Sequence, residues 1–186
     1  MTTDAIVVPL KRFDLAKDRL RQAAKLDVTR LAEDLALGVL RSSSPRHVIV
    51  LSESDEISRF ADAHGAEAWR SEAQSLNEAV QGAYAALRER FDRLLIVHGD
   101  LSHPEGLGRF DPGPGITIVA DRHRAGTNVL VVPTDIDFHF AYGPDSLRLH
   151  RAEANRLGAA CAVLYDSPWR FDVDEPADLE EPPDSI

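Results

Sequence analysis

The sequence predicts a single α/β domain in which helices cover both faces of a mostly parallel central sheet. Two patterns support this prediction: short β-branched apolar runs without polar interruption, and amphipathic segments of helical period between them. Length sets a further limit, because 186 residues with 44% hydrophobic content can build one buried core but hardly two. We therefore expect a three-layer, Rossmann-like domain over residues 1–180, followed by a frayed tail at 181–186.

Strands and helices alternate in the first half of the chain. Ala5–Pro9 is short, apolar and β-branched, which is typical of a central strand covered on both faces. Apolar residues then recur with helical spacing from Leu26 to Leu40, and a second strand is expected at His47–Leu51. A third buried strand is expected at Arg93–Val97. This order is typical of a parallel sheet with right-handed crossovers.

The remaining elements are marked by caps and breakers. Ser75 begins a helix that precedes Arg93–Val97, and Glu78 three residues later would complete a capping box. In the second half, Gly143-Pro144 opens a helix that Gly158 ends. Three more strands are expected at Ile116–Val119, Asn128–Val132 and Cys161–Tyr165. A short acidic helix is expected after Pro176.

Composition narrows the cellular setting. The single cysteine, Cys161, excludes an intramolecular disulfide and favours a reducing, cytoplasmic location. The N-terminus lacks the pattern of a secretory signal, and no apolar stretch approaches the roughly 20 residues that span a bilayer. We expect neither secretion nor membrane insertion.

Charge is distributed unevenly along the chain. The net charge of −10 argues against a general nucleic-acid binder. Residues 1–30 carry seven basic side chains and four acidic ones, whereas residues 166–186 carry eight acidic side chains and one basic one. A basic start and an acidic finish suit a site that holds phosphates with one segment and a metal cation with the other. On charge alone, solvated surface is the simpler interpretation.

Two candidate site segments follow predicted strands, where open parallel sheets bind their ligands. After the first strand, Lys11, Lys17 and Arg19 could reach a triphosphate, although a solvated helix with ordinary charge pairs explains them equally well. Asp100 stands where the third strand ends, and a carboxylate there can hold Mg²⁺ against nucleotide phosphates. An aspartate in this position is as often a turn former or a helix cap.

Two further candidates lie in the second half. Thr127, Gly143 and Ser146 could capture an anion, because Gly143 permits close backbone approach and free amides near Ser146 form the positive end of a helix. Asp172 and Asp174 alternate in an extended segment, so their carboxylates face the same side and could complete a metal site with Asp100. Taken singly, a turn, a helix start and a helix cap are the simpler interpretations.

Taken in order, these segments resemble the 2-phospho-L-lactate guanylyltransferase family, with its phosphoenolpyruvate guanylyltransferase members, which act in the biosynthesis of the deazaflavin coenzyme F-420. The resemblance covers nearly the whole chain. Its most specific parts are Gly-Thr-Asn, Gly-x-x-Ser and the closing Asp-x-Asp. The matching segments are Pro9-Leu10-Lys11, Ala16-Lys17-Asp18-Arg19-Leu20, Ser75-Leu76-Asn77-Glu78-Ala79, Gly99-Asp100-Leu101-Ser102, Gly126-Thr127-Asn128-Val129-Leu130, Phe140-Ala141-Tyr142-Gly143-Pro144-Asp145-Ser146 with His150, and Asp172-Val173-Asp174-Glu175-Pro176-Ala177-Asp178-Leu179.

The resemblance implies a metal-dependent nucleotidyltransferase that moves GMP from GTP to the phosphate of phosphoenolpyruvate, 2-phospho-L-lactate or 3-phosphoglycerate and releases pyrophosphate. It implies Mg²⁺ as the cofactor. Asp100 and Lys17 would be catalytic. The implied binding residues are Asp100, Asp172 and Asp174 for metal; Pro9, Lys11, Lys17, Arg19 and Asn77 for GTP; and Thr127, Gly143 and Ser146 for the acceptor acid.

The chain departs from the family pattern at several places. Asp18, Ser75 and Ser102 stand where a serine, a glycine and a proline are expected, Glu175 replaces a threonine, and Tyr142 replaces the second aromatic. An acid inside a phosphate-binding segment weakens its attraction for phosphate. These departures indicate a divergent member with a different acceptor acid, or one that has lost turnover.

Two alternatives stay open. The same fold serves other nucleotidyltransferases and small glycosyltransferases that use an Asp-x-Asp metal site, although 186 residues leave little room for a sugar-acceptor domain. A catalytically silent nucleotide-binding module is the other. The sequence does not determine the acceptor acid, the base, or whether the chain forms a homodimer.

Overall fold

The computed structural model describes residues 3–17, 20–21 and 27–179. Predictions for Arg19 and for the tail at 181–186 lie outside these residues. The described strands are β1 (Asp4–Pro9), β2 (His47–Ser52), β3 (Glu67–Arg70), β4 (Arg93–Val97), β5 (Ile116–Ala120), β6 (Thr127–Pro133) and β7 (Cys161–Leu164). The α-helices are α2 (Val28–Ser42), α3 (Asp55–Ala63), α4 (Leu76–Leu87) and α5 (Ser146–Arg156), with 3₁₀ turns at Phe13–Leu15, Leu107–Arg109, Pro168–Arg170 and Pro176–Leu179.

The strands form one mixed sheet in the order β3-β2-β1-β4-β6-β5-β7. Pairing is parallel except at β6, which runs antiparallel to both β4 and β5. The predicted single α/β domain with a mostly parallel sheet is therefore confirmed. The first strand lies between β2 and β4, inside the sheet, as its unbroken apolar run predicts.

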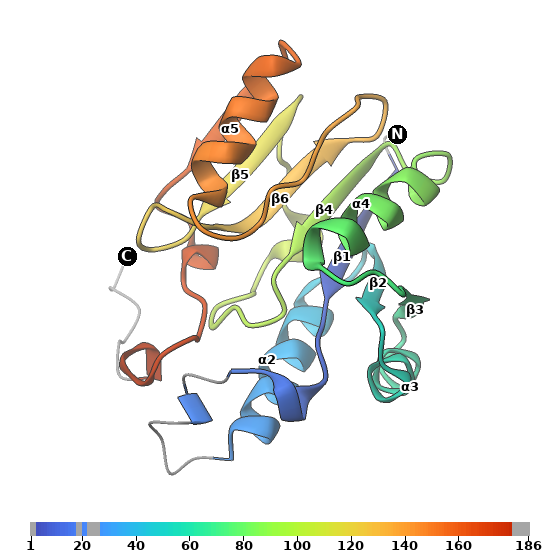
Figure 1. The fold of residues 1–186 in the computed structure, drawn as a ribbon, viewed down its shortest axis with the longest axis vertical. Coiled ribbons are helices and arrows are strands. Elements are labelled where there is room, and N and C mark those ends of the chain that lie inside the picture. The colour runs from blue at the N-terminus through green and yellow to red at the C-terminus, as the bar shows by residue number, and fades with distance from the viewer. Residues whose placement is uncertain (1–2, 18–19, 22–26, 180–186) are drawn as a thin grey trace.

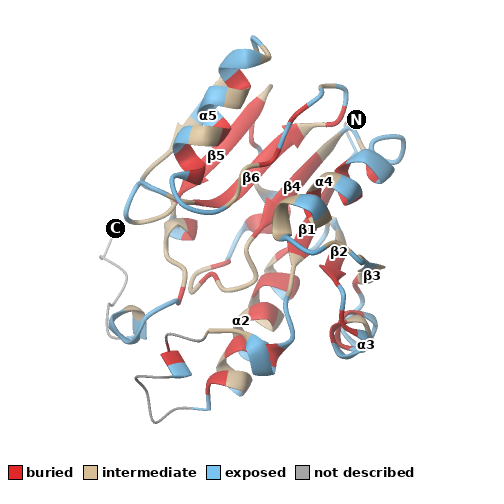
Figure 2. Cartoon of the chain, viewed as in Figure 1, coloured by how far each residue is buried: buried red, intermediate tan, exposed pale blue. Residues whose placement is uncertain are grey.

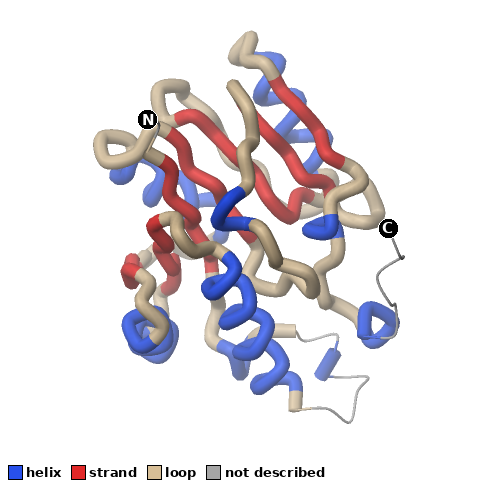
Figure 3. Tube along the Cα trace, turned by 180° about the vertical axis from the view of Figure 1, so that it is seen from behind, coloured by secondary structure: helices blue, strands red, loops and turns tan. Residues whose placement is uncertain are grey.

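Helices cover both faces of this sheet. Figure 1 shows α4 and α5 on the near face, and the reverse view in Figure 3 shows α2 on the other face. Alternate residues of β1 accordingly join different cores: Ile6 and Val8 pack with α2 and α3, whereas Ala5 and Val7 pack with α4 and α5. Burial is concentrated along the strands and the inner helix faces (Figure 2).

Two caps behave as their sequences suggest, and one helix start does not. Ser75 Oγ accepts from the backbone N–H of Glu78 at 3.2 Å, as predicted, whereas Glu78 Oε2 accepts from the N–H of Gln74 rather than from that of Ser75, so the second bond of the capping box is displaced by one residue. Gly158 follows α5 in the left-handed conformation, with φ at 64°. The prediction that Gly143-Pro144 opens this helix places its start too early. Asp145, at φ 60°, is the N-cap, so α5 begins at Ser146.

The strand-end loops decide where the site forms. The carboxyl ends of β1 and β4 lie at the same edge because the two strands are parallel. Val97 of β4 pairs with Val129 of the antiparallel β6, so the start of β6, rather than its end, reaches that edge. No helix in the described part of the chain combines the length and apolar composition that crossing a membrane requires.

Candidate active site

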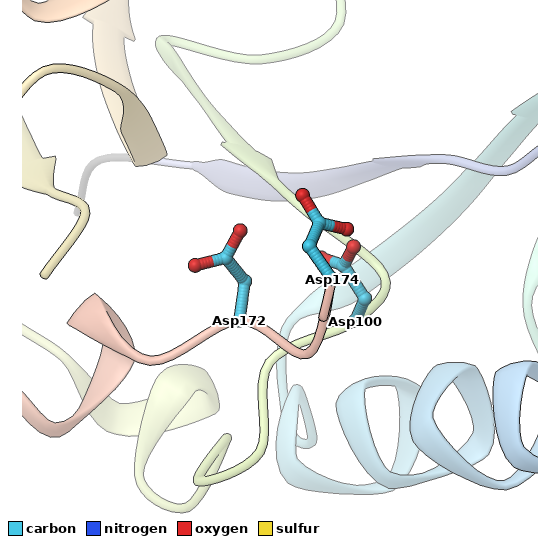
Figure 4. A group of neighbouring side chains, drawn as sticks. All are labelled: Asp100, Asp172 and Asp174. Carbon is cyan, nitrogen blue, oxygen red and sulfur yellow. The ribbon is translucent and has the colours of Figure 1, made fainter. Parts of the chain in front are cut away.

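A group of three carboxylates lies beyond the end of β4. Ligand oxygens of Asp100, Asp172 and Asp174 all lie within 4.8 Å of one another. Figure 4 shows Asp172 and Asp174 on the C-terminal segment, with Asp100 reaching them from the loop after β4. Alternation along an extended segment puts Asp172 and Asp174 on the same side, as the sequence predicts.

Backbone hydrogen bonds hold the C-terminal segment against the β4 loop. Leu101 and Asp172 form an antiparallel bridge. The N–H of Ser102 donates to Phe171 at 3.0 Å, and that of Val173 donates to Asp100 at 3.1 Å. The separation of the carboxylates is therefore set by main-chain pairing rather than by flexible side chains.

Asp178 and Arg122 fasten the far end of the same segment. Asp178 Oδ2 accepts from the backbone N–H groups of Asp174 and Glu175, both at 2.7 Å. Its carboxylate also forms an ion pair with Arg122. Sequence reasoning gave Asp178 no role, although it belongs to the closing motif, where an aspartate that caps the preceding N–H groups is a recognisable turn signal.

Asn128 supports Asp172 from the neighbouring strand. Its Nδ2 donates to the carbonyl of Trp169 at 3.1 Å and to Asp172 Oδ1 at 3.3 Å. Burial and the charges of Asp100 and Asp174 raise the pKa of Asp172, and this hydrogen bond only partly opposes the rise. The negative charges of the three neighbouring carboxylates are thus not fully compensated by these hydrogen bonds.

Lys17 supplies one positive charge to this group. Its Nζ forms an ion pair with Asp100 and lies 3.1 Å from Asp174 Oδ1, although the side chain is only 6% exposed. Burial acts to lower the pKa of Lys17, but the charges of the two carboxylates outweigh it and the pKa is raised. The backbone of Lys17 adopts φ 63°, a left-handed conformation that is unusual outside glycine.

The residues fit a divalent metal ion. Hard cations such as Mg²⁺ prefer carboxylate oxygens, and three are gathered here. Oδ1 of Asp100 is buried and has no hydrogen-bond partner within the described residues. A buried, unsatisfied carboxylate oxygen is costly unless a ligand meets it.

A cleft of about 590 Å³ adjoins the carboxylates. That volume is typical of small-molecule sites. Pro9, Lys11 and Lys17, all predicted to bind GTP, line it together with Asp100 and Asp174. Polar residues at and just after the end of β2 and in the segment before α4 also line it, namely Ser52, Glu53, Ser71, Gln74 and Ser75.

Asn77, also predicted to bind GTP, has other partners in this structure. Its Oδ1 accepts from the backbone N–H of Tyr142 at 2.6 Å, and its Nδ2 donates to the Tyr142 carbonyl at 3.0 Å. The side chain therefore fastens the loop before α5 to α4. A contact between Asn77 and GTP stays a prediction.

The predicted acceptor-binding residues lie together next to the metal-ligand candidates. Thr127 begins β6, and its Oγ1 lies 3.1 Å from Nδ1 of His150 on α5. Gly143, with φ at 124°, precedes α5, and its carbonyl accepts from the N–H of Ser146 at 3.2 Å. The N–H of Leu147 donates to Ala125 and so ties α5 to the turn before Thr127.

His150 is neutral and fixes the arrangement of Thr127. Its Nε2 accepts from the backbone N–H of Ala141 at 3.1 Å, so the ring proton is on Nδ1 and points to Thr127 Oγ1. Burial lowers the pKa of His150 to about 4, with His98 adding to the effect. The hydroxyl proton of Thr127 is thereby left for another acceptor.

Comparison with protein families identifies the family of this chain. A family model described as "Guanylyl transferase CofC like" matches residues 4–182, which include every candidate site residue. The chain belongs to this family. Membership identifies it as a guanylyltransferase and confirms the resemblance drawn from the short motifs.

Individual relatives agree with the family match. The chain is 33% identical to a phosphoenolpyruvate guanylyltransferase of Sphaerobacter thermophilus over 192 residues, covering 97% of this chain and 92% of the relative. It is 26% identical to a 3-phospho-D-glycerate guanylyltransferase of Colwellia psychrerythraea, covering 94% and 89%. The alignment with each relative spans most of both chains.

A solved structure confirms the fold of this guanylyltransferase family member. A nucleotidyl transferase from Methanothermobacter thermautotroptrophicus superposes with a TM-score of 0.63 at 15% identity, covering 96% of this chain and 94% of that one. At this identity the likeness extends to the fold alone. The predicted nucleotidyltransferase fold is confirmed.

Proposed function

We propose that this guanylyltransferase transfers GMP from GTP to the phosphate of phosphoenolpyruvate, with 3-phosphoglycerate and 2-phospho-L-lactate as the alternative acceptors, within deazaflavin coenzyme biosynthesis. The relatives named for phosphoenolpyruvate and 3-phosphoglycerate support this choice of acid. The observation that carries the proposal is the Asp100, Asp172 and Asp174 group beside a nucleotide-sized cleft.

In the proposed reaction, an oxygen of the acceptor phosphate attacks the α-phosphorus of GTP. The bond between the α-phosphorus and the bridging oxygen breaks, and pyrophosphate leaves with that electron pair. No covalent enzyme intermediate is needed, so positioning and charge neutralisation supply the acceleration.

The chain's residues divide this work between two sides of the site. Lys11 and Lys17, at the cleft, would hold the triphosphate, and Lys17 would turn from the carboxylates towards the phosphate oxygens. Thr127, Gly143 and Ser146 would hold the acceptor acid with a hydroxyl and with backbone groups at the start of α5. Asp100, Asp172 and Asp174 would hold Mg²⁺, which would neutralise phosphate charge between the two substrates.

Pyrophosphate release with GTP and Mg²⁺ tests the proposal. We expect phosphoenolpyruvate to support turnover, and Asp100→Asn to lower kcat by at least about 100-fold, the usual scale for losing one charge-stabilising group. Asp62→Asn, on the exposed face of α3, is the matched control and should behave as wild type. Wild-type turnover by Asp100→Asn, or turnover of none of the three acids, would contradict the proposal.

A further inference from the structure

Two buried polar atoms between the cleft and the acceptor-side residues are unsatisfied. His98 Nε2 and the Tyr142 hydroxyl are both shielded from solvent and have no hydrogen-bond partner within the part of the chain that the structure describes. Their rings lie side by side, with centroids 5.5 Å apart. Leaving a hydrogen-bonding group buried and unpaired is costly, so a pair of such groups in one place points to a missing ligand.

The sheet explains why these two side chains meet. Leu94 and Ile96 of β4 pack with α4 and α5, and His98 continues the same alternation beyond the strand end. Its ring therefore emerges on the α4 and α5 side, beside Tyr142. His98 also lines the cleft, so it lies where the nucleotide side and the acceptor side of the site join.

Tyr142 is held in place independently of its hydroxyl. Asn77 binds its backbone N–H and carbonyl, and its ring packs against His150 with centroids 4.8 Å apart. Burial raises the pKa of Tyr142, so the hydroxyl stays protonated and can donate. A rigid, protonated hydroxyl without a partner is suited to an anionic oxygen.

The position favours the acceptor acid over GTP. Tyr142 directly precedes Gly143, and its ring contacts His150, which in turn binds Thr127. Asp172 lies within electrostatic reach of His98, so a ligand bound here would approach the carboxylate group from the acceptor side. Within the described residues, the cleft lining includes His98 but not Tyr142, which places the hydroxyl beyond the nucleotide cleft.

From these contacts we infer that the Tyr142 hydroxyl and His98 Nε2 bind an oxygen of the phosphorylated carboxylic acid and help to select that acid. The inference rests on the proposed function, because it names specificity-determining residues for the same reaction. The hydroxyl donates to the acid, and Nε2 meets the same or the neighbouring oxygen. Neither side chain takes part in bond making.

Tyr142→Phe is the decisive variant because it deletes one oxygen atom and keeps the ring. We expect KM for phosphoenolpyruvate to rise by about tenfold or more, the scale of a lost hydrogen bond to a charged group, with KM for GTP unchanged within about twofold. Tyr165→Phe, which removes a tyrosine hydroxyl elsewhere, is the matched control and should change neither KM. His98→Phe should raise KM for the acid in the same way.

Thermal melting separates binding from a structural role. If the hydroxyl were only an unsatisfied buried group, Tyr142→Phe would melt at a higher temperature and leave the KM for the acid unchanged, and that result would overturn the inference. Calorimetric titration of phosphoenolpyruvate into wild type and variant, with Mg²⁺ present, gives a second readout. An absence of turnover by the wild type would refute the proposed function. Weaker binding by the variant would still support the inference in that case. Equal binding, or no binding to wild type, overturns the inference.

Discussion

The backbone N–H of Val173 donates to the carbonyl oxygen of Asp100 across 3.1 Å, and this one bond joins segments 73 positions apart. Together with the bridge between Leu101 and Asp172, it adds the C-terminal segment to the loop after β4 as a short antiparallel pair. The carboxylates of the candidate active site are therefore fixed by backbone geometry. Substitutions that alter charge should leave the arrangement intact, whereas substitutions that release the segment should disperse it.

Lys17 offers the first test of charge. Lys17→Met removes the cation that pairs with Asp100 and Asp174, and we expect kcat to fall by about 100-fold because one preorganised charge is lost. Lys17→Arg keeps the charge and should recover part of the activity. Single-turnover rates at saturating GTP measure the loss in Lys17→Met and the recovery in Lys17→Arg. A kcat for Lys17→Met within threefold of wild type would contradict the role of Lys17.

Asp172 should destabilise the protein when no metal is bound. Its pKa is raised by burial and by the charges of Asp100 and Asp174, so the folded state holds the proton more tightly than the unfolded chain. Stability is then highest below the unfolded pKa and falls as pH rises through the folded pKa. At neutral pH, Asp172→Asn should raise Tm in a chelator by about 2–4 °C, the effect of roughly 1 kcal/mol in a chain of this size.

Magnesium should reverse that ranking. We expect Mg²⁺ to raise the Tm of wild type by linkage and to leave Asp172→Asn nearly unchanged, since the variant has lost one of the proposed ligands. Asp166→Asn, at a side chain that is 90% exposed, serves as the control and should keep the wild-type response. If Asp172→Asn had a lower Tm than wild type in the chelator and a full response to magnesium, this account would be refuted.

Asp178 should control metal affinity without touching the metal. Asp178→Ala removes the acceptor for the N–H groups of Asp174 and Glu175 and the partner of Arg122. We expect the half-saturating Mg²⁺ concentration for activity to rise by about tenfold, the lower end of what outer-sphere substitutions cost, while kcat at saturating Mg²⁺ changes little. A loss of kcat at an unchanged Mg²⁺ requirement would argue against this positioning role.

His150 should make stability depend on pH. Burial lowers its pKa to about 4, so the unfolded chain binds a proton that the folded state does not. The contribution of His150 to the free energy of unfolding is fully present above the ordinary histidine pKa and is lost as pH falls towards 4. The loss between pH 7 and pH 5 is about 2 kcal/mol.

The comparison between variants isolates this histidine. His150→Gln should show a smaller loss of unfolding free energy between pH 7 and pH 5 than wild type, whereas His64→Gln, at an exposed histidine after α3, should match wild type. Urea denaturation at the two pH values measures the difference. Equal losses in wild type and His150→Gln would show that His150 is not the group responsible.

The sequence by itself determined the elements whose signals are local. The apolar runs of β1, β2 and β4 need burial on both faces, and Ser75 with Glu78 caps α4, so each could be recognised from a few adjacent residues. The same holds for the short motifs that carried the family resemblance. Among the α-helices and strands in the described part of the chain, α3 and β3 were missed. β3 is a four-residue edge strand without an apolar run, and it gives no such local signal.

Only the tertiary structure decided how the site is assembled. Nothing local requires β6 to run antiparallel, yet that reversal places Thr127 at the edge where β4 ends. The union of Asp100 with Asp172 and Asp174 depends on main-chain pairing between distant segments, and the burial of Lys17 among them depends on that union. Long-range hydrogen bonds and shared burial are properties of the folded chain, because they join residues that sequence spacing does not relate.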